Sequence, residues 1–512
     1  MATRPKLKRI DLLGEGNQAL FRIASPQRNQ LERHLFQRYP HREWGTFFSF
    51  GYRRTSSTLI LSYVDGVWPN PGDLDRQVAL TRFRDQYSRR AFQSSAEGPL
   101  AIGVVHSHPE GFATFPSALD DDMDLYFAQE FSAFGKGSPY ASLIFQRSST
   151  GGFTFTGRVY DRGQWLSVNK LLVIGETIES YQTELMPTQD IGDTVSATKA
   201  ESTTARLSSL IGDASARRLR NAVVGVVGCS GTGSPAVHVL ARAGVGEFVL
   251  ADPQRFGRSN LERLHGATWD DAQADKPDYK VQIMSRLIRS INPSAKITAL
   301  AGNILHENVF DELLRCDLLL GCTDTQHGRA ALSDASQLYL VPSLDAGILM
   351  EGKAGRIESQ ITEIDVFSPL LPCAFCASRI DTAEMAVELM TDAEKAIRRE
   401  QAKAAAERGD DPDQYWRHRP RQLHTVGYLA TMTGAMLAGY AEGWLTGAFA
   451  PPHPTVQFDI GRERFGVVAP PRLPVEGCTC ASIRGWADQA RSYRNVVLPP
   501  HWSKRGQLIS RT

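Results

Sequence analysis

The chain has 512 residues, with 57 lysines and arginines against 56 aspartates and glutamates, so its formal net charge is +1. This length predicts roughly two to four domains, and the ordinary share of apolar residues argues against extensive disorder. A nearly neutral chain lacks the bulk basic field of a dedicated nucleic-acid binder. The N-terminus lacks a signal-peptide core, and the longest uncharged run, 426–441, is shorter than the roughly 20 residues of a membrane span. We therefore expect a cytoplasmic protein without a membrane segment, in which 426–441 forms a buried helix.

The first third of the chain predicts an α+β domain. β-branched and aromatic residues gather in runs that we expect to be strands, at 45–52, 58–63, 100–106, 141–146 and 152–160. Helical patterns lie at 29–39 and 119–134. A stretch rich in Thr, Ser and Asp follows at 186–204 and predicts an interdomain linker.

The remainder predicts an α/β, Rossmann-like domain. Strand-like runs alternate with helical stretches at 223–227, 247–251, 295–301 and 317–321, which indicates a parallel sheet with crossover helices. A charged, Ala-rich helical insertion is expected at about 382–419. The expected domains are therefore 1–185 and 205–512, joined by the linker.

Residues 106–120 read HSHPEGFATFPSALD and contain residues that commonly ligate zinc. His106 and His108 alternate at the end of a strand, so both side chains project from one face. Asp120 lies at the start of a helix. An isolated His-x-His is more often a solvated strand end, but two imidazoles with one carboxylate form a three-ligand zinc set that leaves the fourth position for water.

A hydrolytic site also needs a base and an oxyanion donor. Glu43 is the upstream candidate base, with Glu97 and Glu110 as alternatives, and Ser117 is the candidate donor. The string H-x-H-P-x7-S-x-x-D with an upstream Glu resembles the JAMM motif of JAB/MPN-domain isopeptidases. The resemblance implies that the two histidines and Asp120 ligate a catalytic Zn²⁺, with Glu43 as general base and Ser117 as oxyanion donor.

Residues 223–234, VVGVVGCSGTGS, predict a strand, a Gly-rich turn and a helix, an arrangement that lets phosphates approach the backbone at a helix N-terminus. Asp252 ends the next strand, where a carboxylate can bind ribose hydroxyls. Ser230 stands at the second glycine position of the dinucleotide fingerprint, which disfavours a dehydrogenase.

Later charged residues favour triphosphate chemistry over hydride transfer. Arg263 lies in SNLERL, Lys280 opens an amphipathic helix, and Asp324 follows the strand DLLLGC. The two cations can offset charge on an α-phosphate, and the aspartate can hold Mg²⁺.

From 223 to about 350 the chain resembles the ThiF/MoeB/E1 adenylation family, in the strings VVGCSGTGSPAVHVLARAGVGEFVLAD, SNLERL, KVQIMSRLIRSINP and GCTDTQHGR. The resemblance implies an ATP site with Mg²⁺ on Asp324 and a homodimer formed through this domain. The implied nucleotide contacts come from Gly228, Gly231, Gly233, Asp252, Asn260, Arg263 and Lys280. The family usually adds an upstream arginine, often from the dimer partner, for which Arg206 is the best match.

The cysteines cluster in two pairs, Cys373-x2-Cys376 and Cys478-x-Cys480. Four thiolates suffice for a closed, structural Zn²⁺, and the alternative is two unrelated pairs of buried thiols. No Cys lies between the two pairs to serve as a thioester acceptor. Either the reaction stops at the acyl adenylate, which we favour, or one Cys of the presumed zinc set accepts the acyl group.

Both resemblances imply one substrate class, a ubiquitin-like protein with a C-terminal glycine. We predict a bifunctional enzyme of a prokaryotic-type ubiquitin-like system, combining a JAMM-type zinc (iso)peptidase with an E1-like, ATP-dependent adenylyltransferase. An E2-like protein is a candidate further partner. The alternatives are processing and activation of a sulfur carrier for cofactor or amino-acid biosynthesis, and a non-catalytic scaffold that binds a ubiquitin-like protein.

Overall fold

The computed structural model describes residues 10–12, 18–76, 81–134, 137–147, 152–183, 203–353, 355–411, 426–461, 467–468, 473–494 and 505–512. Almost all of the expected linker at 186–204, and residues 412–419 of the expected insertion, lie outside these ranges. The chain forms two compact units. The first comprises Met1–Ala200, Leu338–Leu340 and Ser482–Arg491, and the second comprises the remainder.

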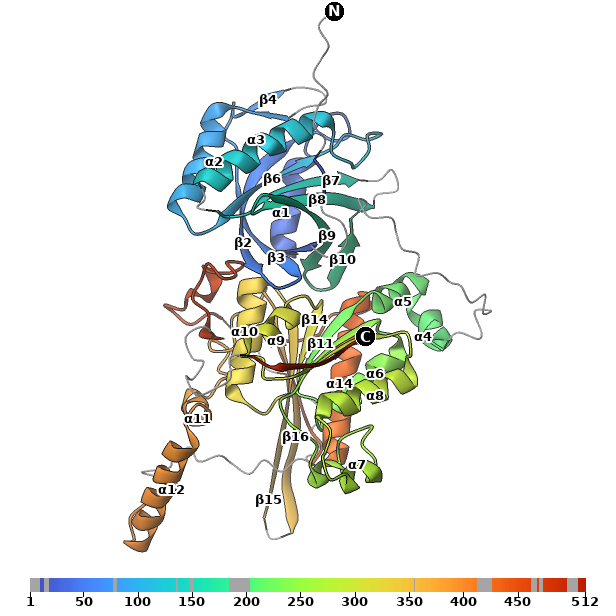
Figure 1. The fold of residues 1–512 in the computed structure, drawn as a ribbon, viewed down its shortest axis with the longest axis vertical. Helices are drawn as coiled ribbons and strands as arrows, with labels where there is room; N and C mark the ends of the chain where they lie inside the picture. Colours follow the sequence, from blue (N-terminus) through green and yellow to red (C-terminus); the bar gives the residue numbers. More distant parts are fainter. Residues whose placement is uncertain are drawn as a thin grey trace, which may run out of the picture. The chain divides into compact units, whose positions relative to one another are not determined.

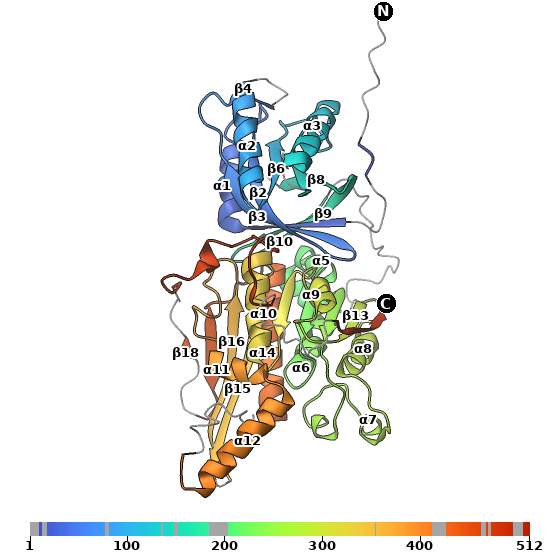
Figure 2. The same ribbon diagram turned by 60° about the vertical axis from the view of Figure 1, so that its left-hand side comes forward.

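The first unit is a sheet with helices on both faces (Figures 1 and 2). Its helices are α1 (Ser25–Leu35), α2 (Asp85–Glu97) and α3 (Ala118–Phe134). Its strands are β1 (Gln18–Ala24), β2 (Gly45–Arg54), β3 (Thr58–Val67), β4 (Leu74–Arg76), β5 (Thr81–Phe83), β6 (Ala101–Ser107), β7 (Tyr140–Arg147), β8 (Phe153–Asp161), β9 (Gln164–Ile174) and β10 (Ile178–Gln182).

The main sheet of this unit has the order β1-β3-β2-β6-β7-β8-β9-β10, and β1 also pairs with β9, so the sheet curls until its first strand meets β9. Alternate residues of β6 serve two cores. Ala101 and Val105 pack in the core that includes α1, whereas Ile102 and Val104 pack in the core that includes α2 and α3. His106 continues the second series and therefore faces α3.

The five strands expected in this unit are confirmed within two residues at most ends, except that β3 continues to Val67. The helix expected at 29–39 is instead α1 at Ser25–Leu35, because Pro26 suits the first turn of a helix and moves the start upstream. Sequence analysis missed α2 and the strands β1, β4, β5, β9 and β10.

The second unit is built on a mixed sheet of order β18-β17-β16-β15-β14-β11-β12-β13-β19. The strands are β11 (Val223–Val227), β12 (Glu247–Ala251), β13 (Lys296–Ala301), β14 (Leu318–Gly321), β15 (Ser343–Lys353), β16 (Arg356–Phe367), β17 (Thr455–Asp459), β18 (Val467–Val468) and β19 (Gln507–Arg511). Neighbours from β13 to β15 pair in parallel. In chain order, these parallel strands are therefore arranged 3-2-1-4-5, which confirms the Rossmann-like fold.

The helices of this unit are α4 (Ala205–Ile211), α5 (Asp213–Arg220), α6 (Gly233–Ala243), α7 (Trp269–Gln273), α8 (Lys280–Ile291), α9 (Glu307–Leu313), α10 (Gln326–Tyr339), α11 (Thr382–Glu388), α12 (Asp392–Glu407) and α14 (Gly427–Thr446), with short 3-10 turns at Arg258–Asn260 and Thr479–Ala481. Helices α6 to α10 connect the parallel strands as crossovers, and the other helices of this unit precede β11 or lie between β16 and β17. Figure 1 shows the hairpin of β15 and β16 extending beyond the other strands of the sheet.

Two expectations about this unit were tested directly by the fold. The uncharged run at 426–441 lies in α14 and its N-cap, as predicted, but only the part of it that packs against α6 and the sheet is buried, and Tyr428 is 52% exposed. The expected charged helix is in fact two helices, α11 and α12. Thr391 separates them, because its side chain accepts a hydrogen bond from the Glu394 amide and caps a new helix.

Candidate functional sites

The Gly-rich turn and Asp324 meet where the order of the parallel strands reverses. The turn follows β11 and Asp324 follows β14, and these two strands are neighbours. Ligands of doubly wound sheets bind at the carboxyl ends of strands at such a switch point. Asp324 is exposed there, between the hydrogen-bonded hydroxyls of Thr323 and Thr325.

The turn uses its glycines to let backbone segments approach closely. Gly228 has φ +98°, and a Cβ there would lie 2.4 Å from the Cys322 carbonyl oxygen. A Cβ on Gly233 would lie 2.0 Å from the Gly228 carbonyl oxygen. Gly231 is close to a different neighbour, since a Cβ there would lie 3.1 Å from Arg263 Cδ. The turn predicted from the sequence therefore has no room for a side chain at Gly228 or Gly233.

Asp252 and Lys280 lie beside this turn. Asp252 is 5% exposed, and its carboxylate accepts hydrogen bonds from the amides of Cys229 and Gln254, at 2.8 Å each. Lys280 Nζ donates to Gln254 Oε1 at 2.5 Å. Burial raises the pKa of Asp252, while Lys280 opposes the rise and Asp324 adds to it. The three charged residues therefore act on one another electrostatically.

The remaining predicted nucleotide residues differ in position. Asn260 is buried and its side-chain oxygen accepts from the Gly257 amide at 2.9 Å. Arg263 is half-buried against Gly231 and lies 3.3 Å from Glu262. Arg206 is exposed in α4, and within the described residues its side chain has no hydrogen bond or ion pair to the Gly-rich turn.

In the first unit, His106, His108 and Asp120 converge from β6 and the first turn of α3. His106 Nε2 lies 3.3 Å from His108 Nε2 and 3.3 Å from Asp120 Oδ1. His108 Nε2 lies 3.6 Å from Asp120 Oδ2. Tetrahedral ligands around a zinc ion with Zn–N and Zn–O bonds are about 3.3–3.5 Å apart. The donor types and their spacing therefore fit a zinc ion.

Backbone contacts orient two of these three residues. His108 Nδ1 donates to the Ala113 carbonyl at 2.6 Å, which leaves Nε2 directed at the group. Asp120 lies in a capping box with Ser117, in which the Ser117 amide donates to Asp120 Oδ2 at 2.6 Å and the Asp120 amide donates to Ser117 Oγ at 3.3 Å. Sequence analysis missed Ala113, because a carbonyl acceptor carries no sequence signal.

Electrostatics strengthen the association of the three side chains. Burial opposes charge on Asp120, but the neighbouring histidines and the Ser117 side chain hold the pKa of its carboxyl well below the ordinary value. Burial disfavours protonation of His106, but Asp120 reverses this effect and leaves the His106 pKa raised.

Glu43 is the candidate base that acts electrostatically on this group. Strand pairing places Gly45 opposite His106, so Glu43 continues toward His108, and its carboxylate also raises the His106 pKa. Glu110 instead acts on Tyr39, and Glu97 ends α2. Ser117 is exposed, and its hydroxyl oxygen accepts the capping hydrogen bond from the Asp120 amide.

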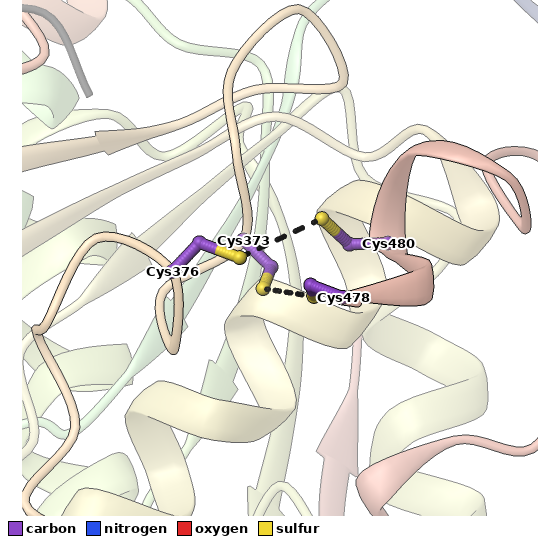
Figure 3. A group of neighbouring side chains, drawn as sticks. All are labelled: Cys373, Cys376, Cys478 and Cys480. Carbon is purple, nitrogen blue, oxygen red and sulfur yellow. Dashed lines mark hydrogen bonds between the residues drawn. The ribbon is translucent and has the colours of Figure 1, made fainter. Parts of the chain in front are cut away.

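The four clustered cysteines come together in the second unit (Figure 3). Cys373 Sγ lies 3.8 Å from Cys478 Sγ, and Cys376 Sγ lies 4.0 Å from Cys480 Sγ. The Val475 amide donates to Cys376 Sγ at 3.3 Å. Sulfur ligands around a tetrahedral zinc ion lie about 3.8 Å apart. The four thiols therefore fit a closed zinc site.

Comparison with known proteins identifies the second unit. Residues 202–480 match the model of the ThiF family. The chain belongs to the ThiF family.

This ThiF-family chain resembles several curated proteins over part of their length. It is 34% identical over 130 residues to the sulfur carrier protein ThiS adenylyltransferase of Escherichia coli (strain K12), covering 25% of this chain and 50% of the relative. It is 28% identical over 158 residues to the SAMP-activating enzyme E1 of Haloferax volcanii, covering 31% and 55%. It is 33% identical over 164 residues to the molybdopterin-synthase adenylyltransferase of Salmonella typhimurium, covering 32% and 61%. The chain therefore spans about half of each relative's length.

Among solved structures, MccB of E. coli with succinimide aligns at a TM-score of 0.41 and 14% identity, covering 55% of this chain and 75% of MccB. Within the described part of the chain, no helix is long and apolar enough to cross a membrane.

Proposed function

We propose that residues 205–512 form an ATP-dependent adenylyltransferase that activates the C-terminal carboxylate of a ubiquitin-like or sulfur-carrier protein. The observation that carries the proposal is the meeting of the Gly-rich turn, Asp252, Lys280 and Asp324 at the switch point of a ThiF-family sheet. The names of the relatives from E. coli and Haloferax support the substrate class. A trans-acting arginine from a homodimer partner and an E2-like acceptor remain parts of the proposal.

In this reaction the chain's own residues bind and orient ATP. The turn at 228–233 offers backbone amides to phosphates at the N-terminus of α6. Asp252 binds the ribose hydroxyls with the lone pairs that its two backbone hydrogen bonds leave free. Asn260, Arg263 and Lys280 stabilise the charge that grows on the α-phosphate when the carboxylate attacks and pyrophosphate leaves. Mg²⁺ on Asp324 would neutralise phosphate charge when bound.

The test is formation of the carrier acyl adenylate from α-labelled ATP. Candidate carriers are small proteins ending in glycine. We expect Lys280→Ala to reduce labelling on the order of 100-fold or more, while Lys296→Ala, on an exposed position of β13, keeps the wild-type yield. Equal labelling by both variants would contradict the assigned role of Lys280.

Two fates of the adenylate remain, attack by sulfide on the sulfur-carrier route and transfer to an amine-bearing acceptor. Cys229 and Cys316 are fully buried, which disfavours a thioester on either of them. Cys322 is partly exposed and adjoins the Gly-rich turn. Adding sulfide or an amine-bearing acceptor to the preformed adenylate separates the routes, since one yields a thiocarboxylate and the other an amide.

We further propose that residues 1–185 form a zinc-dependent (iso)peptidase, joined to the second domain through the linker at 186–204. The spacing of His106, His108 and Asp120 supports this proposal. Zn²⁺ held there would polarise a carbonyl and supply a water of lowered pKa. Glu43 takes and returns the proton, and the Ser117 hydroxyl donates to the developing oxyanion.

The peptidase proposal is tested by two matched carboxamide variants. Glu43→Gln should lose cleavage of a ubiquitin-like fusion by at least about 100-fold while it retains metal, because only proton transfer is removed. Glu110→Gln should cleave normally. If Glu110→Gln loses cleavage and Glu43→Gln does not, the base is Glu110. If neither variant changes the rate, the proposed site is wrong.

A further inference from the structure

A buried ionic network lies directly behind the three candidate zinc ligands. Arg158, at the centre of β8, is 5% exposed. Its Nη1 donates to Asp121 Oδ1 at 2.5 Å, and its Nε donates to Asp124 Oδ2 at 2.7 Å. The Tyr140 hydroxyl donates to the other oxygen of Asp124 at 2.7 Å. Asp124 and Tyr140 are fully buried.

This network fixes the part of α3 that carries Asp120. Asp121 follows Asp120 in the chain, and Asp124 lies one helical turn further along. One planar guanidinium holds both carboxylates. It therefore fixes the position of this turn along the axis of α3 and its rotation about that axis. Strand pairing places Val104, Ser142 and Arg158 in one row across β6, β7 and β8, so the helix is anchored on the face of the sheet from which His106 projects.

The network is not explained by stability alone. Burying one cation with two carboxylates costs desolvation energy, and apolar replacements of buried ion pairs are often equally or more stable. The next turns of α3 pack with Phe127 and Phe131 in an apolar core. Charged contacts are therefore concentrated in the turns next to Asp120, where orientation matters most.

We propose that Arg158, with Asp121, Asp124 and Tyr140, is a positioning group that sets the Asp120 carboxylate against His106 and His108 and thereby determines metal affinity. The inference rests on the proposed zinc peptidase and deepens it. Residues that orient metal ligands typically affect affinity by about 10- to 100-fold.

The experiment is Co²⁺ titration of the full-length protein followed by visible absorption. Thiolate-to-cobalt charge transfer reports the four-cysteine group, and the ligand-field bands that His106→Ala removes report the His/Asp group. Arg158→Met should weaken Co²⁺ binding at the His/Asp group about 10- to 100-fold and leave the thiolate signal unchanged. Arg54→Met, which removes an ion pair between β2 and Asp161 at the end of β8, should leave both signals unchanged.

A second variant separates positioning from folding. Asp121→Leu and Asp124→Leu with Arg158→Met replace all three buried charges by apolar groups and should recover thermal stability, while Co²⁺ affinity at the His/Asp group stays at least about 10-fold lower. Wild-type affinity in this variant would overturn the positioning role alone. Ligand-field bands that survive His106→Ala would instead refute the metal site, and the inference with it.

Discussion

At the scale of single residues, the proposed nucleotide site depends on where side chains are absent as well as on where charges lie. The backbone of the Gly-rich turn folds against itself and against the residues after β14. Gly228 and Gly233 allow this contact, since a Cβ at either position would overlap a carbonyl oxygen. Asp252 then ties the turn to β12 through the Cys229 amide. The turn is therefore pre-shaped before any ligand binds.

Substitution of Gly233 tests this packing. Gly233→Ala places a methyl group 2.0 Å from the Gly228 carbonyl oxygen and should destabilise the second unit by about 1–3 kcal/mol. Gly439→Ala, in α14, meets no atom within 4 Å and should leave the protein equally or slightly more stable. Thermal unfolding of the two variants provides the measurement. A Gly233→Ala protein as stable as Gly439→Ala would show that the turn has more room.

At the scale of elements, the two units differ in what the sequence could predict. Strands β11 and β12 were predicted with their observed bounds because short apolar runs end at Gly or Asp. The same alternation of strands and helices was enough to predict the parallel sheet. The order of the motifs along the chain also placed the Gly-rich turn and Asp324 at the ends of strands. From these positions it follows that the turn and Asp324 lie close together.

Other features could not be predicted because they depend on tertiary contacts. Strand β1 is buried along nearly its whole length and shows no alternation of polar residues. The anchoring of α3 by Arg158 joins residues 34 and 37 positions apart, and an arginine in a strand gives no sign of its partner. The two pairs of cysteines could be predicted to converge only because four thiols together suit one metal ion.

Removing one thiol tests the closed zinc site. The protein should bind about two zinc ions per chain, one at each group. Cys373→Ser should release one of them and lower the melting temperature of the second unit, because metal binding and folding are coupled. His106→Ala should release the other and leave the second unit's melting unchanged. Metal analysis and calorimetry check both, and a wild-type protein with one zinc that Cys373→Ser retains would contradict the four-thiol site.

The long helix α14 contains a carboxyl group whose titration opposes folding. Burial raises the pKa of Glu442 to about 7 from an ordinary value of 4.5. The unfolded chain therefore releases this proton at lower pH than the folded protein, so the group costs stability progressively as pH rises from 4.5 to 7. Glu442→Gln removes this cost and should raise the melting temperature more at pH 8 than at pH 5. Glu400→Gln, exposed on α12, should show no such difference between the two pH values.

At the scale of the whole molecule, the chain does not divide into two continuous parts. Residues Ser482–Arg491 belong to the first unit, although the sequence placed them in the second domain. Within the first unit, Arg53 donates to both carboxylate oxygens of Asp488 at 3.0 and 3.1 Å, and Gln489 accepts from the Tyr52 amide at 2.8 Å. Because no compositional break marks these ten residues, the sequence gives no sign that they pack in the first unit.

Asp488→Ala tests the contribution of this segment. The variant removes two hydrogen bonds from Arg53, which is 5% exposed, and should destabilise the first unit by about 1.5–3 kcal/mol. Asp410→Ala breaks an exposed ion pair with Arg408 and should cost at most about 1 kcal/mol. Chemical denaturation compares them. Equal stabilities of the two variants would mean that residues 482–491 do not support the first unit.

Carrier-dependent ATP–pyrophosphate exchange tests most directly the proposal that the second unit activates a carrier protein with ATP. Wild-type protein and Asp270→Ala, altered at an exposed position of α7, should exchange equally. Asp324→Ala should exchange on the order of 100- to 1000-fold more slowly with little change in thermal stability, because Asp324 is exposed at the switch point and not part of the core. Normal exchange by Asp324→Ala, or binding of NADH and not ATP by the wild-type protein, would contradict the claim.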